Sequence, residues 1–377
     1  MIDRVVIAPD KFKGSLAAAD VASRVAAGLT RSGFAGEITA LPVADGGDGT
    51  VAAAISAGYR RVELGVRGPT GKAVNASFAL HGGTAVIEAA QACGLALLKP
   101  GELAPLTATS RGVGELILAA TRMGAKRVVL GVGGTASTDG GAGLLQALGA
   151  RLTDDTGLQL PPGGAALARL AVLELSGLKD LTGVEFLLAS DVDNPLLGPS
   201  GAAAVYAPQK GASPADVRLL EAGLTRWADV AEAALATADS LRDAPGTGTG
   251  GGLGFAALLF LGARMRPGIE LLLEMLSFGE RLDGARLVIA GEGSLDEQTL
   301  RGKAPAGVAR AAAAHDPAVP VVAVAGRCTL SAAMLKEAGI SAVYPLTDLE
   351  PDPDRCIAEA GPLIERAAEQ IAADWLS

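Results

Sequence analysis

The segment Arg4-Val5-Val6-Ile7-Ala8, or RVVIA, decides the expected fold, and a loop from Pro9 to Gly14 follows it. A short run of β-branched and apolar residues is typical of a buried strand in a parallel sheet. Apolar residues then recur every four positions from Val21 to Leu29, as they do on the buried face of a helix. Because Arg286 to Ala290, RLVIA, repeats the opening segment in the last third of the chain, we expect both chain ends to contribute strands to one sheet.

Further strands are expected around these two segments. Apolar runs at Ile38 to Val43, Val319 to Ala325 and Ala342 to Leu346 alternate with helical segments. This alternation predicts an α/β fold in which five strands form a doubly wound parallel sheet. In such folds the ligand binds outside the carboxyl ends of the strands, so the loops that follow the strands are the first places to look for a site.

The pattern changes in the middle of the chain. From Arg61 onward, alternating residues are interrupted by Gly-Pro and Gly-Gly turns, which is typical of antiparallel hairpins. Helix and strand segments then return before the last third. We therefore predict a discontinuous domain formed by residues 1–62 and 267–377, a second α/β domain inserted at 63–266, and a site in the cleft between them.

The composition excludes several classes of protein. The net charge is −9 and aromatic residues make up only 3% of the chain, which argues against nucleic acid as a partner. The three cysteines are far apart and form no C-x-x-C pair, so we expect a reduced protein. The N-terminus has no signal-peptide pattern, and the longest apolar run, Gly252 to Ala263, is too short to span a bilayer. We expect a cytoplasmic protein without a membrane partner; a homo-oligomer stays open.

The loop after the first strand, APDKFKGSL at residues 8–16, holds Asp10, Lys11, Lys13 and Ser15. Ser15 is expected to cap the following helix, whose N-terminal N–H groups favour an anion. The alternative is an ordinary turn with solvated lysines.

The loop after the second strand, ADGGDGT at residues 44–50, places Asp45 beside Gly46 and Gly47. Glycines let the backbone approach a ligand, and carboxylates suit Mg2+ or the proton of a hydroxyl group. The alternative is a tight turn in which Asp48 caps the next helix.

Two loops of the inserted region are also rich in polar groups. GVGGTASTDGGAG, residues 131–143, includes Gly133, Gly134 and Thr135 and suits phosphate oxygens or a carboxylate. SDVDNPL, residues 190–196, carries two aspartates two positions apart, a spacing that suits metal binding or proton abstraction. An Asx turn is the alternative for the second loop.

The segment GEGSLDEQTLRGKAP, residues 291–305, brings many polar groups after a buried strand, among them Glu292, Asp296, Arg301 and Lys303. We favour a functional site here over a plain surface loop. The sequence has neither G-x-x-x-x-G-K-[ST] nor the protein-kinase motifs, so any bound ATP must be held by another design. GTGTGGGLG, residues 246–254, follows no strand and is not expected to bind a dinucleotide.

Together and in order, these segments resemble the bacterial glycerate kinase family that includes the glyoxylate- and glucarate-pathway enzymes. The resemblance is carried by APDKFKGSL, PVADGGDGT, ATSRGVGELI, GVGGTASTDGGAG, SDVDNPLLGPSGA, GTGTGGGLG and GEGSLDEQT with GKAPAGVA. It implies a flavodoxin-like domain interrupted by a second α/β domain, ATP and Mg2+ as cofactors, and glycerate as the phosphate acceptor. Lys11 stands where the family pattern has Ser, and residues 135–138 read Thr-Ala-Ser-Thr in place of Ser-Ala-Thr-Asn.

The chemistry implied by the resemblance suggests roles for individual residues. Asp191 is the expected base or metal carboxylate, and Asp45 and Asp193 are the expected Mg2+ ligands. Lys13 and Lys303 are expected to meet phosphate or carboxylate charge. The remaining binding residues are expected to be Asp10, Ser15, Gly46, Gly47, Arg111, Gly133, Gly134, Thr135, Glu292 and Asp296, with Arg111 assigned to the substrate carboxylate.

The resemblance favours phosphorylation at O2, which gives 2-phosphoglycerate, and O3 is the alternative. A different class, a nicotinamide-dependent oxidoreductase, would need a glycine fingerprint directly after Ala8, where the sequence has DKFKG instead. A non-enzymatic binding module is the third class.

Overall fold

The computed structural model describes residues 3–236, 239–300 and 302–377. The chain divides into two compact units, Met1–Gly58 with Pro267–Ser377 (the first unit) and Tyr59–Arg266 (the second unit). The first crossing between units follows Gly58, not residue 62 as expected from the sequence. The reason is that strand β3 (Arg60–Arg67) pairs along its whole length with β4 (Ala73–His81), so residues 59–62 belong to the second unit.

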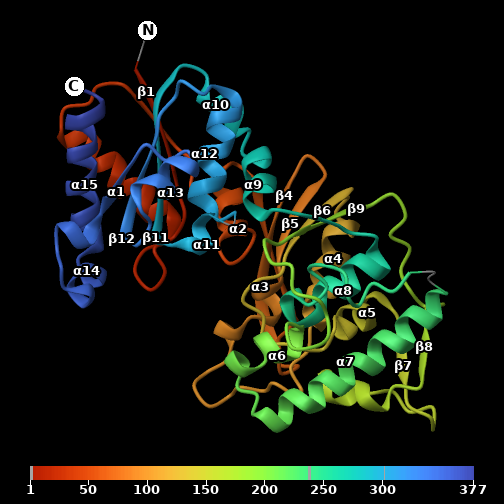
Figure 1. Cartoon of the computed structure of the whole chain (residues 1–377). Helices are drawn as coiled ribbons and strands as arrows, with labels where there is room; N and C mark the ends of the chain where they lie inside the picture. The colour runs from red at the N-terminus through yellow and green to blue at the C-terminus, as the bar shows by residue number, and fades with distance from the viewer. Residues whose placement is uncertain (1–2, 237–238, 301) are drawn as a thin grey trace. The chain divides into compact units, whose positions relative to one another are not determined.

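The first unit is built on five parallel strands (Figure 1). Their order is β13-β12-β11-β1-β2. Counted within this unit alone, that order corresponds to the flavodoxin-like arrangement 2-1-3-4-5. The strand bounds are β1 Arg4–Pro9, β2 Glu37–Ala40, β11 Ala285–Leu295, β12 Val321–Cys328 and β13 Ala342–Pro345. These strands confirm the α/β class, and β1 and β11, the two similar segments, pair directly in register at Ile7 and Ile289.

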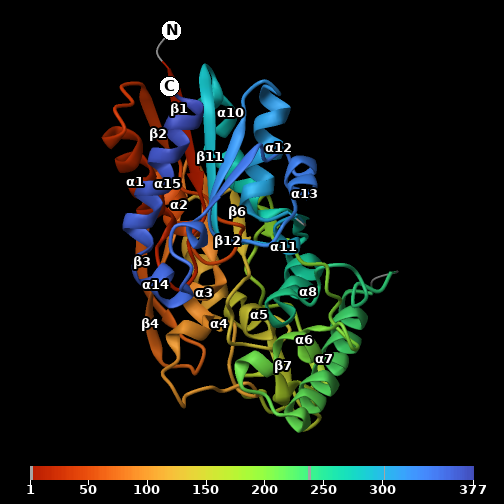
Figure 2. The same ribbon diagram turned by 60° about the vertical axis from the view of Figure 1, so that its left-hand side comes forward.

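Helices cover both faces of this sheet (Figures 1 and 2). Alternate strand residues such as Val5 and Ile7 pack under α1 (Ala18–Arg31) and α15 (Ala360–Trp375). The remaining helices of this unit are α2 Thr50–Ser56, α9 Gly268–Met275, α10 Phe278–Leu282, α11 Glu297–Leu300, α12 Ala304–His315, α13 Ala332–Glu337 and α14 Pro353–Ala358. The opposite set of strand residues, including Val6 and Ala8, packs with residues of α2, α9, α10 and α12.

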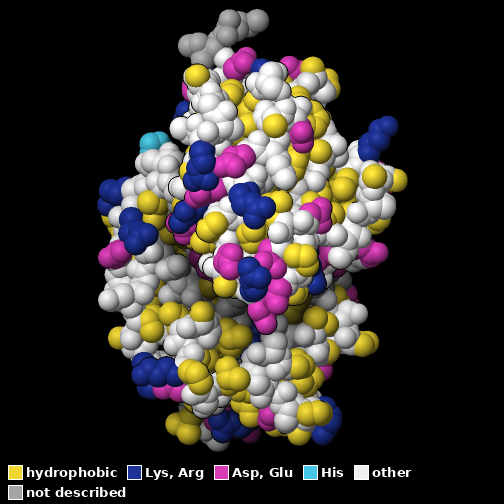
Figure 3. Space-filling view, turned by 90° about the vertical axis from the view of Figure 1, so that its left-hand side faces the viewer, with side chains coloured by type: hydrophobic (Ala, Val, Ile, Leu, Met, Phe, Trp, Pro, Cys, Tyr) yellow, Lys and Arg dark blue, Asp and Glu magenta, His cyan; other side chains and the backbone are white. Residues whose placement is uncertain are grey.

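The outer surface of the first unit carries intermixed charges (Figure 3). Arg24 and Arg31 of α1 pair with Glu365 of α15 at 2.7 and 2.5 Å. Both arginines are about half exposed, so each pair contributes only modestly to stability. No helix within the described part of the chain has the length and apolar character needed to cross a membrane.

The second unit contains a mixed six-stranded sheet in the order β10-β9-β6-β5-β4-β3. The pairs β3–β4 and β4–β5 are antiparallel, as the alternating pattern after Arg61 predicts, and the other pairs are parallel. The remaining strands of this sheet are β5 Thr84–Glu88, β6 Arg127–Gly131, β9 Glu185–Ala189 and β10 Arg264–Arg266, and β7 Arg151–Thr153 pairs separately with β8 Val172–Glu174.

Helices complete the core of the second unit. The buried Trp227 stacks on Phe260 and donates its indole N–H to the carbonyl of Gly140 at 2.9 Å. That hydrogen bond ties a long helix to the glycine-rich loop after β6. The helices are α3 Ala89–Cys93, α4 Arg111–Arg122, α5 Ala142–Leu148, α6 Ala202–Tyr206, α7 Pro214–Leu235 and α8 Thr249–Leu261.

One expected helix start is wrong. Helix α1 begins at Ala18 with Ala17 as its N-cap, and Ser15 does not cap it. The reason is a tight turn in which the N–H of Phe12 donates to the carbonyl of Leu16 at 2.9 Å, with Gly14 at φ +82°. The Ser15 hydroxyl donates to the carbonyl of Ile357 at 3.0 Å.

Candidate active site

In the first unit, three carboxylates follow neighbouring strands at the edge where the strands have their carboxyl ends. Asp10 follows β1, Glu292 lies in the last part of β11, and Asp45 is in the loop that continues from β2. The N–H of Asp10 donates to the carbonyl of Gly291 at 2.8 Å, which holds the β1 and β11 ends together. Asp10 and Glu292 are buried, with exposed fractions of 6% and 9%.

The environment of Asp10 is that of a proton-binding group. Burial raises the pKa of Asp10 to about 7; Lys11 opposes this shift, and the charges of Asp45 and Glu292 add to it. The N–H of Lys11 donates to one carboxylate oxygen of Asp10 at 2.6 Å. A carboxyl group with such a pKa changes its protonation state near neutral pH.

Lys303 and Glu292 form a close pair. The Lys303 ammonium group donates to Glu292 Oε1 at 3.0 Å, and the Thr299 hydroxyl donates to Oε2 at 3.0 Å. Burial raises the pKa of Glu292 despite these bonds. Burial also acts to lower the pKa of Lys303, but the hydrogen bond and charge of Glu292 outweigh it, so the pKa of Lys303 is raised. Lys303 is therefore a fixed cation beside the buried carboxylates.

The Asp45 loop is held by its backbone. Asp45 Oδ1 accepts the N–H of Gly47 at 3.2 Å. Gly268, the first residue of α9, packs so tightly on this loop that a Cβ there would lie 2.2 Å from the carbonyl oxygen of Asp45. Gly49, not Asp48, is the N-cap of α2, so the alternative interpretation of Asp48 as a helix cap is wrong. The Lys11 ammonium group donates instead to the carbonyl of Asp48.

The other predicted residues of the first unit are placed differently. Lys13 is exposed, and its backbone nitrogen lies near Gly293 of β11. Asp296 accepts the N–H of Gln298 at 2.9 Å, which closes a local turn before α11, and its charge also acts on Lys303. Arg301 lies outside the described residues. The structure thus brings Asp10, Asp45, Glu292 and Lys303 together, whereas the Ser15 hydroxyl is bonded to Ile357.

In the second unit, the loop after β6 presents an exposed glycine turn on a buried base. Gly133 and Gly134 are exposed, and residues 135–141 are buried. The carbonyl of Gly134 accepts the N–H of Leu95 at 2.8 Å, and the N–H of Ala136 donates to the carbonyl of Cys93 at 2.7 Å. Strand β6 holds the chain before the turn and these two hydrogen bonds hold its end, so the backbone of the turn is in a defined position to meet a ligand.

The segment after β9 carries Asp191 and Asp193, and both side chains are exposed. The preceding residue, Ser190, makes a hydroxyl–hydroxyl hydrogen bond of 3.2 Å with Thr249, the first residue of α8. Burial raises the pKa of Tyr206, and the charge of the nearby Asp193 adds to the shift. The Tyr206 hydroxyl donates to the side chain of Asn194 at 2.5 Å, so the aspartate segment is fixed at both ends.

Arg111 begins α4, at the same edge of the sheet. Its Nε lies 3.6 Å from Oε1 of Glu115, and its backbone N–H donates to the Thr109 hydroxyl at 3.2 Å. Glu115 also accepts the backbone N–H of Arg67 at 2.8 Å. The Arg111 side chain is about one-third exposed, which leaves part of its surface accessible to a substrate anion.

Three buried charged residues of the second unit were missed by sequence reasoning: Glu88, Asp139 and Lys210. Glu88 ends β5 at the edge of the sheet described above. Asp139 accepts the backbone and hydroxyl groups of Ser110 at 2.8 and 2.9 Å and thereby joins α4 to the glycine loop. Asp139 lies in the motif GVGGTASTDGGAG, which is a sequence signal for a site. Lys210 lies outside every motif, so its sequence gives no such signal.

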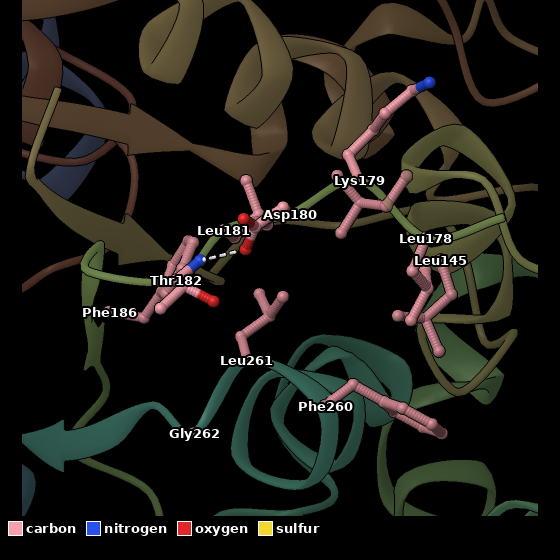
Figure 4. A pocket seen from close by; sticks show the side chains of 11 residues that line it. Leu145, Leu178, Lys179, Asp180, Leu181, Thr182, Phe186, Phe260, Leu261 and Gly262 are labelled. Atoms are coloured by element: carbon pink, nitrogen blue, oxygen red, sulfur yellow. Dashed lines mark hydrogen bonds between the residues drawn. The ribbon is translucent and has the colours of Figure 1, made fainter. Parts of the chain in front are cut away.

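Two hollows in the molecule lie away from these loops. One, of about 420 Å3, is lined by Leu145, Phe186, Leu261 and their neighbours near the amino end of β9 (Figure 4). Asp180 faces this hollow but already accepts the N–H of Thr182 at 2.9 Å. The other, of about 620 Å3, lies among α9, α10 and α12. The carboxyl ends of the strands carry the polar chemistry, so the site is assigned to the loops.

Comparisons with known proteins identify the family. A model of the glycerate kinase family matches residues 5–376. The glycerate kinase of Bacillus subtilis (strain 168) is 44% identical over 98% of this chain and 97% of its own. The glycerate 2-kinase of Escherichia coli (strain K12) is 41% identical over the same shares. A crystal structure designated glycerate kinase 2 from Salmonella typhimurium LT2 superposes with a TM-score of 0.83 at 39% identity, covering 99% of this chain and 98% of the other.

These matches confirm the resemblance inferred from the sequence, and they give no support to an oxidoreductase. The chain belongs to the glycerate kinase family, kinases that use ATP to phosphorylate an alcohol group.

Proposed function

We propose that this chain transfers the γ-phosphate of ATP to O2 of glycerate and releases ADP and 2-phosphoglycerate. The observation that carries the proposal is the family match over residues 5–376, together with 41% identity to a relative named glycerate 2-kinase. In the reaction the bond between O2 and the γ-phosphorus forms, the bond from that phosphorus to the ADP oxygen breaks, and the hydroxyl proton leaves O2. We further propose a cytoplasmic location.

Transfer of a phosphate group requires positioning and charge neutralisation more than covalent chemistry by the protein. We propose that Lys303 and Lys13 meet anionic oxygens from the first unit, while the exposed turn at Gly133 and Gly134, with Thr135, meets them from the second. Arg111 is proposed to hold the substrate carboxylate. The support is that Lys303 is a fixed cation next to Glu292 and that backbone hydrogen bonds at Gly134 and Ala136 anchor the end of the glycine turn.

Asp191 is proposed as the base that takes the proton from O2, or as a metal carboxylate. It is exposed and follows a strand whose carboxyl end lies beside the glycine loop in the sheet order. A base must reach the hydroxyl group that it deprotonates, which requires an accessible side chain at this edge.

The residues fit a requirement for Mg2+. Among residues 3–236, 239–300 and 302–377, no three or more His, Cys, Asp or Glu side chains form a group that could hold a metal ion. Mg2+ in kinases needs only one or two carboxylates, since phosphate oxygens and water complete its coordination. We propose Asp45 and Asp193 as these carboxylates. Bound Mg2+ supplies positive charge that neutralises the β- and γ-phosphates.

The test is to identify the product. The protein is incubated with ATP, magnesium and glycerate, and the phosphorylated carbon is assigned by 31P and 13C NMR. We expect 2-phosphoglycerate in equal amount to ADP. Formation of 3-phosphoglycerate would contradict the assignment to O2, and no ADP formation with glycerate would contradict the function. A parallel incubation with NAD in place of ATP is expected to leave glycerate unchanged.

A further inference from the structure

Lys210 is a buried cation that the proposed roles above do not use. It ends the short 3-10 turn Pro208–Lys210 of the second unit, and only 2% of its surface is exposed. Lysine is rarely buried to this extent without partners, because its ammonium group loses hydration. The burial of this ammonium group therefore needs a physical explanation.

The partners of Lys210 all belong to the loop after β6. The ammonium group donates to the Thr135 hydroxyl at 3.3 Å and to the backbone carbonyl of Ser137. These two acceptors directly follow the exposed turn at Gly133 and Gly134 in the sequence. Lys210 is thus joined to the buried part of a segment whose preceding residues, Gly133 and Gly134, are exposed.

The glycine-rich start of α8 closes around the same ammonium group. A Cβ at Gly251 would lie 2.9 Å from Lys210 Nζ and 2.1 Å from the carbonyl oxygen of Ser137. Gly251 also has φ +71° and accepts the N–H of Gly140 at 3.0 Å. Glycine is therefore needed at position 251 for a close approach to Lys210 and to the loop that it holds.

The charge of Lys210 is only partly compensated. The titratable groups that act on it are Asp139, in the same loop, and Cys93, at the end of α3. Asp139 is already a target for the N–H groups of Ser110, Gly141 and Gly143. Burial raises the pKa of Cys93 to about 12, so this thiol is neutral at physiological pH. Charges act over longer distances in a poorly hydrated interior, so the positive charge of Lys210 favours an anion at the exposed turn.

We propose that Lys210 is a positioning residue for substrate binding: it fixes the loop at residues 131–143 from its buried side, so that Gly133 and Gly134 receive an anionic oxygen of a substrate. The inference rests on the proposed kinase function. The anionic oxygen belongs either to a phosphate of ATP or to the carboxylate of glycerate. In both cases Lys210 acts through the loop and does not touch the reacting atoms.

The first test compares Lys210→Met with Lys126→Met, an exposed lysine just before β6 that serves as the matched control. We expect Lys210→Met to raise KM for one substrate by about tenfold, with a change in kcat of less than about threefold. The substrate whose KM rises identifies the source of the anionic oxygen. The control should stay within about twofold of the wild type in both constants. Equal KM values for both substrates in Lys210→Met and the wild type would overturn the proposal.

A second readout distinguishes positioning by charge from simple packing. Burial lowers the pKa of Lys210 to about 8, while the charge of Asp139 opposes the shift. As the pH rises through this value the ammonium group loses its charge, so KM for the same substrate should rise in the wild type. Lys210→Gln keeps a hydrogen-bond donor without the charge and should lack this inflection. The same inflection in Lys210→Gln and the wild type would contradict the proposal.

Hydrogen exchange without substrate completes the test. We expect faster amide exchange in residues 131–143 of Lys210→Met, and unchanged exchange in the sheet of the first unit. If Lys210→Met does not fold, Lys210→Gln and the wild-type pH profile decide. If the wild type fails to phosphorylate glycerate, the proposed function is wrong. Amide exchange still tests whether Lys210 fixes the loop at residues 131–143. Equal exchange in this loop of Lys210→Met and the wild type would overturn that role.

Discussion

The loops at the carboxyl ends of the strands differ in chemistry between the two units. In the first unit these ends carry buried acids, Asp10 and Glu292, with Lys303 bonded to one of them. In the second unit the corresponding loop exposes glycines, and its buried cation, Lys210, lies on the inner side. The first edge gathers buried carboxylates, and the second has an exposed glycine turn whose following residues are bonded to a buried cation.

The edge at the carboxyl ends of the strands is therefore adapted to opposite charges in the two sheets. Carboxylates with a raised pKa suit a proton or a cation, whereas anchored glycine turns suit anionic oxygens. A kinase needs both kinds of group, because it must neutralise phosphate charge and accept a hydroxyl proton. We infer that each unit supplies one part of this chemistry.

The largest expected effect is the loss of activity when the divalent cation proposed to bind the carboxylates is removed. Exhaustive chelation of divalent cations should abolish activity, because the phosphates of ATP would lose the Mg2+ that neutralises them. Turnover is measured by ADP release, and restoring MgCl2 should restore it. Full turnover after chelation would show that the reaction does not require Mg2+.

The next largest effect tests the aspartates of the second unit. Asp191→Asn should lower kcat by a factor of about 100 or more without loss of folding, because a base or metal ligand is lost with little change in shape. Asp180→Asn is the matched control, since Asp180 is exposed and forms a local turn near the amino end of β9. A fall in kcat of less than about threefold would reduce Asp191 to a turn residue.

A third prediction tests the packing of the Asp45 loop. Gly268→Ala adds a methyl group 2.2 Å from the carbonyl oxygen of Asp45, so the loop must move. We expect kcat/KM to fall by about tenfold or more, together with a loss of about 1–3 kcal/mol in the free energy of unfolding. Gly284→Ser provides a control for substitution itself, because Gly284 has open space around it and a φ of +73° that is strained for serine. It should lower stability but leave kcat/KM near the wild-type value. Unchanged activity in Gly268→Ala would show that the Asp45 loop needs no fixed position.

The last of these predictions concerns stability alone, not activity, and has a defined sign. The pKa of Asp10 is raised from 3.8 to about 7 on folding, so the folded protein binds more protons than the unfolded chain between these values. The free energy of unfolding therefore falls as the pH rises from about 4 to 7, and the penalty is fully present above pH 7. Asp10→Asn removes it and should be more stable than the wild type at pH 8 by about 2–4 kcal/mol.

Denaturant unfolding at several pH values measures this difference. The advantage of Asp10→Asn should shrink as the pH falls toward 4 and should vanish below about pH 3, where the wild-type carboxyl group is protonated in both states. Asp155→Asn, at an exposed position, should show little dependence of this kind. A stability difference that does not change with pH would mean that Asp10 is not destabilised by burial of its charge.

The sequence predicts most of the fold because its strands carry local signals. RVVIA and RLVIA predict β1 and β11, which pair directly. Helix starts are harder, because caps depend on three-dimensional turns. Ser15 has the right residue type for a cap, but the turn from Phe12 to Leu16 separates it from α1.

The site is predicted only in part for a related physical reason. Loops that follow buried strands can be identified from their glycines and acidic residues, and this pattern predicts Asp10, Asp45 and Glu292 as site residues. Burial, however, depends on the neighbours that the fold supplies. The sequence therefore did not distinguish the buried Lys210 from an exposed lysine such as Lys126, nor the bonded Ser15 from an accessible one.

Hydrogen exchange is the most direct test of whether loops of both units take part in one reaction. The wild-type protein is compared with and without glycerate plus a non-hydrolysable ATP analogue. We predict slower exchange in the loops around Asp45 and Asp296 of the first unit and around Gly134 and Asp191 of the second. Slower exchange confined to the loops of one unit would contradict the claim.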